Sequence, residues 1–210
     1  DLTREDLDAF GAQSQQRAAV ARDEGRFEQE IVPIEVDVDG ETVVVKNDEG
    51  IRDGTTAEGL ANLKPAFKED GKITAGNSSQ ISDGASAVLI MSAEKAAELG
   101  MKPRAKFHSF ALAGTDPVTM LKGPIPATKK ILEKTGLTID DIDLFEVNEA
   151  FAVVALAAQD ALGIPSDKLN VRGGSVAVGH PIGASGARIL TTLLHAMVAQ
   201  DATCGLAAIC

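Results

Sequence analysis

Short apolar segments typical of buried strands alternate, from residue 105 onward, with longer segments that have helical spacing. The segments expected as strands are residues 105–112, 142–147, 175–178 and 204–210. Those expected as helices are residues 127–135, 150–162 and 187–199. Strands that alternate with helices predict an α/β layer structure, whose functional side chains lie in the loops at the strand ends.

The first half of the chain is expected to be less regular. Residues 3–24 predict a helix, and residues 31–38 and 42–46 predict two strands around the Asp39-Gly40 turn. Residues 47–81 are interrupted by Gly and Pro, and an irregular stretch of this length is often functional. The segment 85–91 is short and apolar, which suits a buried strand or helix.

A further helix is expected over residues 93–99, with Ser92 as its cap. The Lys102-Pro103 pair then suggests a joint between two parts of the chain.

Charge and cysteine content exclude several classes of partner. The net charge of −11 argues against nucleic acid and anionic membranes, because both require a basic surface. Cys204 and Cys210 are the only cysteines, which indicates a reducing, cytoplasmic setting rather than a disulfide framework. They lack the spacing of a zinc site, so no metal is expected. The chain does not begin with Met, and we therefore expect a partial chain.

The first candidate for chemistry is His180, within the glycine-rich stretch from Gly173 to Arg188. It lies between a predicted strand and a predicted helix, where an imidazole can meet a ligand and move protons near neutral pH. A glycine-rich turn with a solvent-facing His is an equally good interpretation of Gly-His-Pro alone. His108 and His195 carry no such context.

Two further candidates have ordinary structural alternatives. Asn148 and Glu149 follow a predicted buried strand, where Asn148 could hold a water or an oxyanion, or could simply cap the next helix. Cys210 would end a buried strand, a usual place for chemistry in an α/β fold, although Cys also serves as a small core residue.

Taken together, these segments resemble the thiolase family. The matching motifs are Asn-Glu-Ala-Phe at 148–151, Gly-His-Pro-Ile-Gly-Ala-Ser-Gly at 179–186, Gly-Leu-Ala-Ala-Ile-Cys at 205–210, Thr-Ala-Gly-Asn-Ser-Ser at 74–79 with Ser-Asp-Gly-Ala at 82–85, and Met-Leu-Lys-Gly-Pro-Ile-Pro-Ala at 120–127. Five motifs in family order make chance an unsatisfactory explanation. Arg172, Ser175 and Gly59 depart from the residues usual in the family.

The resemblance implies a layered αβαβα thiolase fold and a role for three residues. Cys210 would be the acid/base, His180 would activate the acylated Cys and help form an oxyanion hole, and Asn148 would hold the water of that hole. The implied reaction is the reversible condensation of two acetyl-CoA to acetoacetyl-CoA and CoA. A degradative 3-ketoacyl-CoA thiolase and a non-catalytic CoA-binding subunit remain alternatives.

The resemblance also implies how the chain is divided and what it binds. Residues 1–81 would be the loop domain that covers CoA, residues 82–102 the end of the N-terminal domain, and residues 103–210 the C-terminal domain. The implied CoA- and acyl-binding residues are Arg52, Leu63, Phe67, Ala75, Ser79, Met120, Ala150 and Phe151. CoA thioesters would be substrates with no separate cofactor, and the full-length protein would be a homodimer or homotetramer. The acylated Cys is expected outside these residues, so the fragment alone is expected to be inactive.

Overall fold

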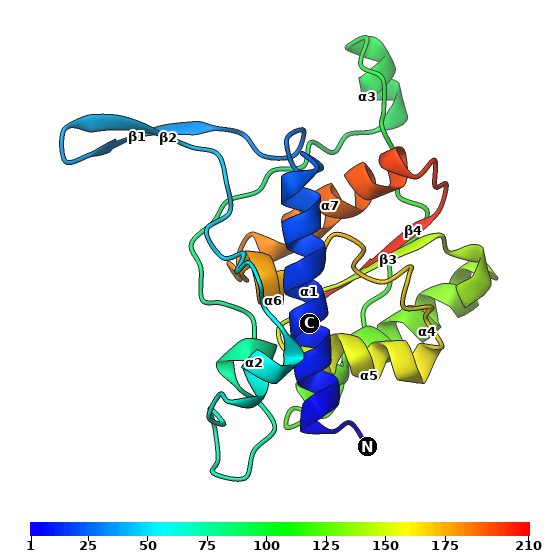
Figure 1. Ribbon diagram of the computed structural model, residues 1–210. Coiled ribbons are helices and arrows are strands. Elements are labelled where there is room, and N and C mark those ends of the chain that lie inside the picture. The colour runs from blue at the N-terminus through cyan, green and yellow to red at the C-terminus, as the bar shows by residue number, and fades with distance from the viewer.

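The computed structural model describes residues 1–210 as a mixture of helices and two small sheets (Figure 1). The helices are α1 (Arg4–Asp23), α2 (Ala57–Ala61), α3 (Ala93–Glu98), α4 (Pro124–Thr135), α5 (Ala152–Leu162), α6 (Ser175–Val178) and α7 (Ser185–Ala199). The strands are β1 (Ile34–Val38), β2 (Glu41–Val45), β3 (Leu144–Val147) and β4 (Gly205–Ala208). Single 3-10 turns are η1 (Ala75–Asn77), η2 (Met120–Lys122) and η3 (Ile139–Asp141).

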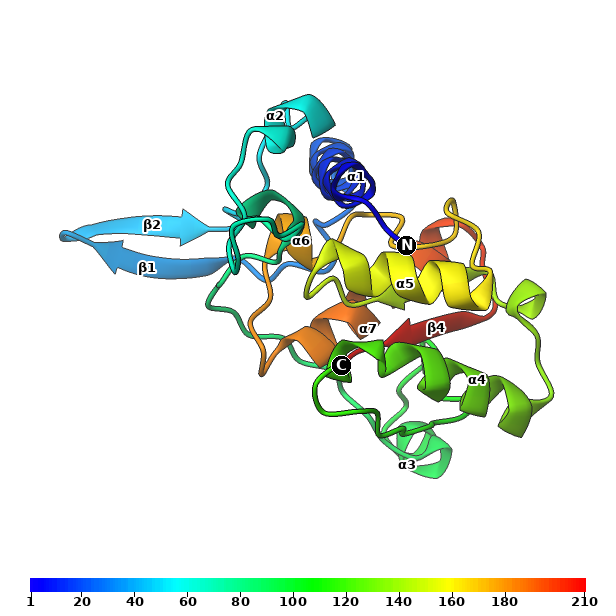
Figure 2. The ribbon, with the colours of Figure 1, turned by 90° about the horizontal axis from the view of Figure 1, so that it is seen from below.

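A parallel pair of strands forms the centre of the molecule. β3 and β4 pair from Leu144 opposite Gly205 to Val147 opposite Ala208, although some sixty residues separate them in the chain. Helix α7 packs on both strands, while α4 packs on β4 and α5 on β3. Figure 2 shows β4 passing among these three helices. The predicted α/β layering is therefore confirmed.

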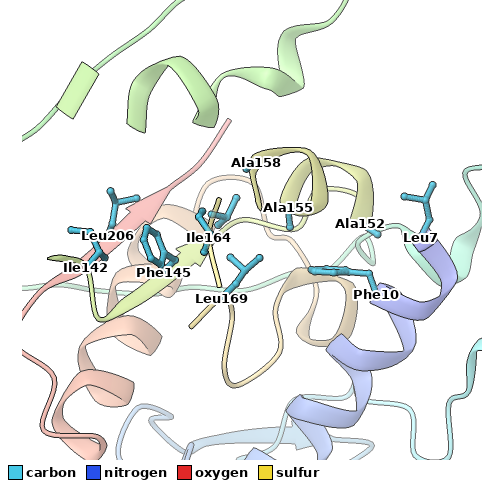
Figure 3. Close-up of a cluster of buried hydrophobic side chains, with 11 residues drawn as sticks. Leu7, Phe10, Ile142, Phe145, Ala152, Ala155, Ala158, Ile164, Leu169 and Leu206 are labelled. Atoms are coloured by element: carbon cyan, nitrogen blue, oxygen red, sulfur yellow. The ribbon is translucent and has the colours of Figure 1, made fainter. Parts of the chain in front are cut away.

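The side chains of β3 alternate between two apolar clusters, as the pleat of a strand requires. Phe145 and Val147 belong to the main core of eleven residues, to which α1 contributes Leu7 and Phe10 (Figure 3). Leu144 points the other way and belongs to a smaller cluster with α7. Full burial of a side chain such as Phe145 stabilises the fold by about 2–3 kcal/mol.

Local signals in the sequence set several element boundaries. Thr3 and Asp6 form a capping box at the start of α1, in which each side chain bonds to the backbone of the other residue. Gly136 and Gly163 end α4 and α5 in the left-handed conformation, with φ of +73° and +70°. The helices predicted at these positions are thus confirmed to within a few residues.

The predicted β-hairpin is also confirmed. β1 and β2 pair antiparallel, and the turn between them has positive φ at Asp39 and Gly40. All residues of both strands are exposed, and the hairpin extends away from the rest of the molecule (Figures 1 and 2).

The prediction of a strand at residues 175–178 was wrong, because this segment is the helix α6. Its valines favour strands, but the buried carboxylate of Glu149 accepts a hydrogen bond from the backbone N of Val176 at 3.2 Å. A first helical turn presents such unpaired N–H groups together, whereas a strand does not. Tertiary contact therefore overrides local preference here.

The segments 85–91 and 105–112 were expected as a buried strand or helix and as a strand, and neither forms regular structure. Both are largely exposed, including Leu89 at 73% and Phe110 at 65%. A strand is stable only when a neighbouring strand pairs with its backbone, and the described residues provide no partner for these two segments. The predictions for these two segments rested on their apolar composition, which does not say whether a partner strand is present.

No helix of the structure combines the length and the apolar character that crossing a membrane requires.

Candidate functional site

The carboxyl ends of the two parallel strands bring Asn148 and Cys210 to one edge of the sheet. Asn148 follows β3 directly, and its backbone N donates to the carbonyl of Ala208, the last residue of β4, at 2.9 Å. Cys210 lies two residues beyond Ala208. This is the edge at which α/β folds place functional side chains.

His180 reaches the same edge from the loop between α6 and α7. Its Nε2 lies 3.2 Å from Asn148 Nδ2, and its Nδ1 lies 2.5 Å from Ser185 Oγ at the start of α7. Its backbone N donates to the carbonyl of Gln80 at 3.0 Å. His180 is thus half-buried and held on both ring nitrogens, which excludes a His that points freely into solvent.

The turn before His180 requires glycine. Gly179 has a φ of +87°, and a Cβ at this position would lie 2.1 Å from Ser82 Oγ. A side chain would therefore be strained by the backbone angle and would collide with the neighbouring segment. The glycine allows the backbone to approach closely enough to aim the imidazole at Asn148.

The electrostatic surroundings favour a neutral imidazole. Burial lowers the pKa of His180, and the positive charge of Arg188 lowers it further. A neutral imidazole can accept a proton from a reacting thiol, which an imidazolium cannot.

Asn148 and Glu149 do not cap the following helix. The residue that precedes α5 is Phe151, and no side chain caps this helix. Asn148 Oδ1 instead accepts a bond from Ser175 Oγ at 2.7 Å. The buried carboxylate of Glu149 accepts bonds from Ser14 of α1, from Asn170 and from the backbone N of Val176 in α6, so it joins α1 and α6 to the loop that follows β3.

Cys210 is exposed, and its thiol donates to the carbonyl of Met120 in η2 at 3.1 Å. A Cβ on Gly123 would lie 3.3 Å from the sulfur, so the backbone between η2 and α4 packs closely against the Cys210 side chain. Figure 2 shows the C-terminus beside α4. The structure therefore joins His180 and Asn148 directly and places Cys210 at their edge of the sheet, with its thiol bonded to η2.

Several residues expected to contact substrate form one group beside this edge. The rings of Phe67 and Phe151 meet edge to face with centroids 6.1 Å apart. Ser79 N donates to the carbonyl of Ala150 at 3.0 Å. Phe67 is 74% exposed, so the group offers an apolar face to a ligand.

Leu63 and Ala75 adjoin this group. A Cβ on Gly76, next to Ala75 in η1, would lie 2.8 Å from Leu63 Cδ1. Leu63 and Ala75 are both exposed at the surface of this region. The segments 60–67 and 75–79 therefore lie side by side although loops separate them.

Arg52 and Met120 are placed by other contacts. The exposed Arg52 is fixed through its backbone N, which donates to Gln15 Oε1 at 2.8 Å. The side chain of Gln80 bonds the carbonyls of both Gly50 and Ala177, so it ties this loop to α6. Met120 is 57% exposed beside Cys210.

Three polar residues of the site were not assigned a role from the sequence. Glu146 and Ser175 are buried, and Arg188 lies between them, 3.8 Å from Glu146 Oε2 and 3.0 Å from Ser175 Oγ. Burial raises the pKa of Glu146 to about 8. A charged residue inside the apolar segment 142–147 was the available signal for Glu146, and the departure of Ser175 from the residue usual in the family was the signal for Ser175. No group of three or more His, Cys, Asp or Glu side chains is arranged to hold a metal ion.

Comparison with known families gives two matches that together cover nearly the whole chain. The family model described as "Thiolase, N-terminal domain" matches residues 1–94, and "Thiolase, C-terminal domain" matches residues 101–210.

Curated relatives are similar over the full length of this chain. It is 53% identical over 210 residues to a protein of Chromobacterium violaceum named acetyl-CoA acetyltransferase, and covers 54% of that protein. It is 51% identical over 214 residues to a 3-ketoacyl-CoA thiolase of Saccharophagus degradans, and covers 55% of it. The chain therefore spans about half the length of these relatives.

Two solved structures share the fold over the whole chain. The acetyl-CoA acetyltransferase of Bacillus anthracis superposes with a TM-score of 0.96 at 43% identity, and human mitochondrial 3-ketoacyl-CoA thiolase with 0.93 at 39%. This chain covers 53% of each.

Proposed function

This chain belongs to the thiolase family, and from that premise we propose that the full-length protein is an acetyl-CoA C-acetyltransferase. It would join two acetyl-CoA molecules to give acetoacetyl-CoA and free CoA, reversibly. The observation that carries the proposal is the contact of His180 with Asn148 at the sheet edge that also bears Cys210.

The proposed chemistry needs a base, because the α-proton of a thioester is a poor acid. Cys210, as thiolate, would take this proton from acetyl-CoA. The resulting carbanion would form a C–C bond to the carbonyl carbon of an acetyl group held on a second cysteine. The C–S bond to that cysteine would break, and its sulfur would leave as the thiolate.

His180 and Asn148 would serve the charged intermediates of this reaction. The neutral imidazole can take the proton of the cysteine that becomes acylated. Once protonated it donates, together with a water held by Asn148, to the enolate oxygen of acetyl-CoA. Removal of one donor of this kind typically costs about 100–1000-fold in rate.

The apolar group around Phe67 and Phe151 would receive the CoA thioester. Leu63, Ala75 and Ser79 would contact its pantetheine and adenine, and Arg52 its charged nucleotide end. Met120, Ala150 and Phe151 would line the acyl pocket. The domain division at residues 81 and 102, a homodimeric or homotetrameric assembly and a cytoplasmic location complete the proposal.

A degradative 3-ketoacyl-CoA thiolase is the second candidate, because a relative of that name is 51% identical, close to the 53% of the acetyltransferase relative. Turnover by the full-length protein with acetoacetyl-CoA and with a long-chain 3-ketoacyl-CoA separates the two. We expect acetoacetyl-CoA to give the higher kcat/KM, and the reverse order would replace the first candidate by the second.

The catalytic role of His180 is tested by His180→Ala, which should lower kcat at least about 100-fold because the base and a donor are lost together. His108→Ala is the control, since His108 is exposed and lies outside the site. A protein that binds CoA but turns over neither substrate, or a His180→Ala variant with full activity, would contradict the proposal.

A further inference from the structure

A continuous row of hydrogen bonds leads from α7 to the imidazole of His180. Arg188 Nη2 donates to Ser175 Oγ at 3.0 Å, and Ser175 Oγ donates to Asn148 Oδ1 at 2.7 Å. Asn148 Nδ2 then lies 3.2 Å from His180 Nε2. Ser175 has no exposed surface, so no water competes for its hydroxyl.

The direction of these bonds follows from the chemistry of the groups. A guanidinium has donors only, so Arg188 occupies an acceptor position of the Ser175 oxygen. The single hydroxyl proton of Ser175 is therefore directed at Asn148, where it meets the amide oxygen. With its oxygen fixed, the amide of Asn148 presents its NH2 to His180.

The same reasoning fixes the tautomer of the imidazole. An amide nitrogen cannot accept a hydrogen bond, so Nε2 of His180 must be the acceptor and Nδ1 carries the proton. Ser185 Oγ accepts the hydrogen bond from this N–H group, and its own hydroxyl donates to the carbonyl of Pro181 at 3.0 Å. The lone pair of Nε2 thus lies on the side of Asn148.

We propose that Ser175 is a positioning residue that, oriented by Arg188, fixes the amide of Asn148 and thereby keeps His180 in the tautomer whose Nε2 carries no proton and can accept one. This proposal rests on the proposed function, because Nε2 is the atom that would take the proton of the cysteine to be acylated. Ser175 would touch no substrate and act only through Asn148.

The test is Ser175→Ala in the full-length protein, with 15N-labelled histidine observed by NMR. His180 is assigned by the signal that disappears in His180→Gln. In the wild type we expect Nδ1 protonated and Nε2 unprotonated. In Ser175→Ala the amide can rotate and turn its oxygen to Nε2, so the tautomer protonated at Nε2 should gain population. The value of kcat should fall about tenfold, with KM unchanged.

Ser14→Ala is the matched control. Ser14 is also a buried serine beside α6, but its hydroxyl donates to the carboxylate of Glu149 and accepts a hydrogen bond from the backbone N of Gly174. This variant should be less stable and keep the wild-type tautomer. Should Ser175→Ala fail to fold, Ser175→Cys fills nearly the same space with a weaker donor and should shift the tautomer in the same direction.

An unchanged tautomer in the Ser175 variant, or an equal shift in Ser14→Ala, would overturn the proposal. The NMR measurement needs no turnover. A tautomer shift in a protein that lacks thiolase activity would therefore reject the proposed function and still support the positioning role of Ser175.

Discussion

Glu146 lies on β3 between two apolar neighbours, on the face of the strand that packs against α7. Its side chain is 2% exposed, and its Oε1 has no hydrogen-bond partner. Arg188 Nη1 is 3.8 Å from Oε2, too far for a direct hydrogen bond and close enough for attraction. Because burial outweighs this attraction, the pKa of Glu146 is about 8 and the side chain is protonated at neutral pH.

This residue makes stability depend on pH in a definite direction. The folded state holds the proton of Glu146 up to about pH 8, whereas the unfolded chain releases it near the ordinary glutamate pKa of 4.5. Since the folded state binds more protons between these values, stability should fall as pH rises from 4.5 to 8.

Glu146→Gln replaces the titrating carboxyl by an amide that stays neutral at every pH. Urea unfolding of the full-length protein should show the variant and the wild type similarly stable at about pH 5, and the variant more stable by up to about 5 kcal/mol above pH 8. An equal difference at both pH values would show that Glu146 does not titrate in this window.

At this scale the sequence predicted the identities of His180, Asn148 and Cys210 as site residues, and the structure joins the first two. The sequence could not predict the hydrogen-bond partners of these side chains, because each contact links segments that only the folded chain brings together. Ser175 reaches Asn148 across 27 residues, and Ser14 reaches Glu149 across 135. No local pattern around a serine contains that information.

At the scale of elements, predictions succeeded where the signal was local. Caps and glycines determine α1, α4 and α5, and the Asp39-Gly40 turn determines the hairpin. The prediction for α6 failed because a distant carboxylate, that of Glu149, stabilises the helical turn. The strand predicted at residues 105–112 is absent, because composition shows a preference for strand structure but not whether a neighbouring strand is there to pair with it.

The loop before α6 should be sensitive to substitution at Gly173. Gly173 has a φ of +74°, and a Cβ there would lie 2.5 Å from the carbonyl oxygen of Ser14 in α1. Gly173→Ala should therefore destabilise the protein by roughly 2–4 kcal/mol through strain and collision together.

Gly163→Ala provides the comparison. Gly163 has a similar φ of +70°, but nothing lies within 4 Å of a Cβ built on it. Its cost should be about 1 kcal/mol, from backbone strain alone. Equal losses of unfolding free energy for the two variants would mean that α1 yields to the added methyl group.

At the scale of the whole molecule, apolar surface is distributed unevenly. Exposed large hydrophobic residues cluster in the β1–β2 hairpin and in the segments 85–91 and 105–112, where Leu89, Phe110 and Leu112 are 73%, 65% and 86% exposed. Lys130 and Lys134 of α4 donate to the carbonyls of Leu112 and Phe110, so the second segment is held along α4. Surface of this kind usually marks a contact with other polypeptide.

The 210-residue chain produced by itself should consequently bind a hydrophobic dye such as ANS and self-associate. Replacement of both Leu89 and Phe110 by Lys should lower the ANS fluorescence at least about twofold and reduce the self-association seen by light scattering.

Val198→Lys is the control, because Val198 is 60% exposed outside both segments and isolated exposed valines are ordinary. It should change the fluorescence little. Dye binding that is unaffected by the double substitution would show that these segments are not the apolar surface involved.

The parallel pairing of β3 with β4 also means that β3 is synthesised well before its partner strand. A ribosome adds α5, α6 and α7 before it reaches Gly205, so Phe145 and its neighbours emerge long before the strand beside them exists. During this interval helices can already pack on the faces of β3, but the edge of β3 that will pair with β4 has no strand beside it. Slow translation between residues 163 and 205 would lengthen that exposure, and chaperone demand should rise with the length of the pause.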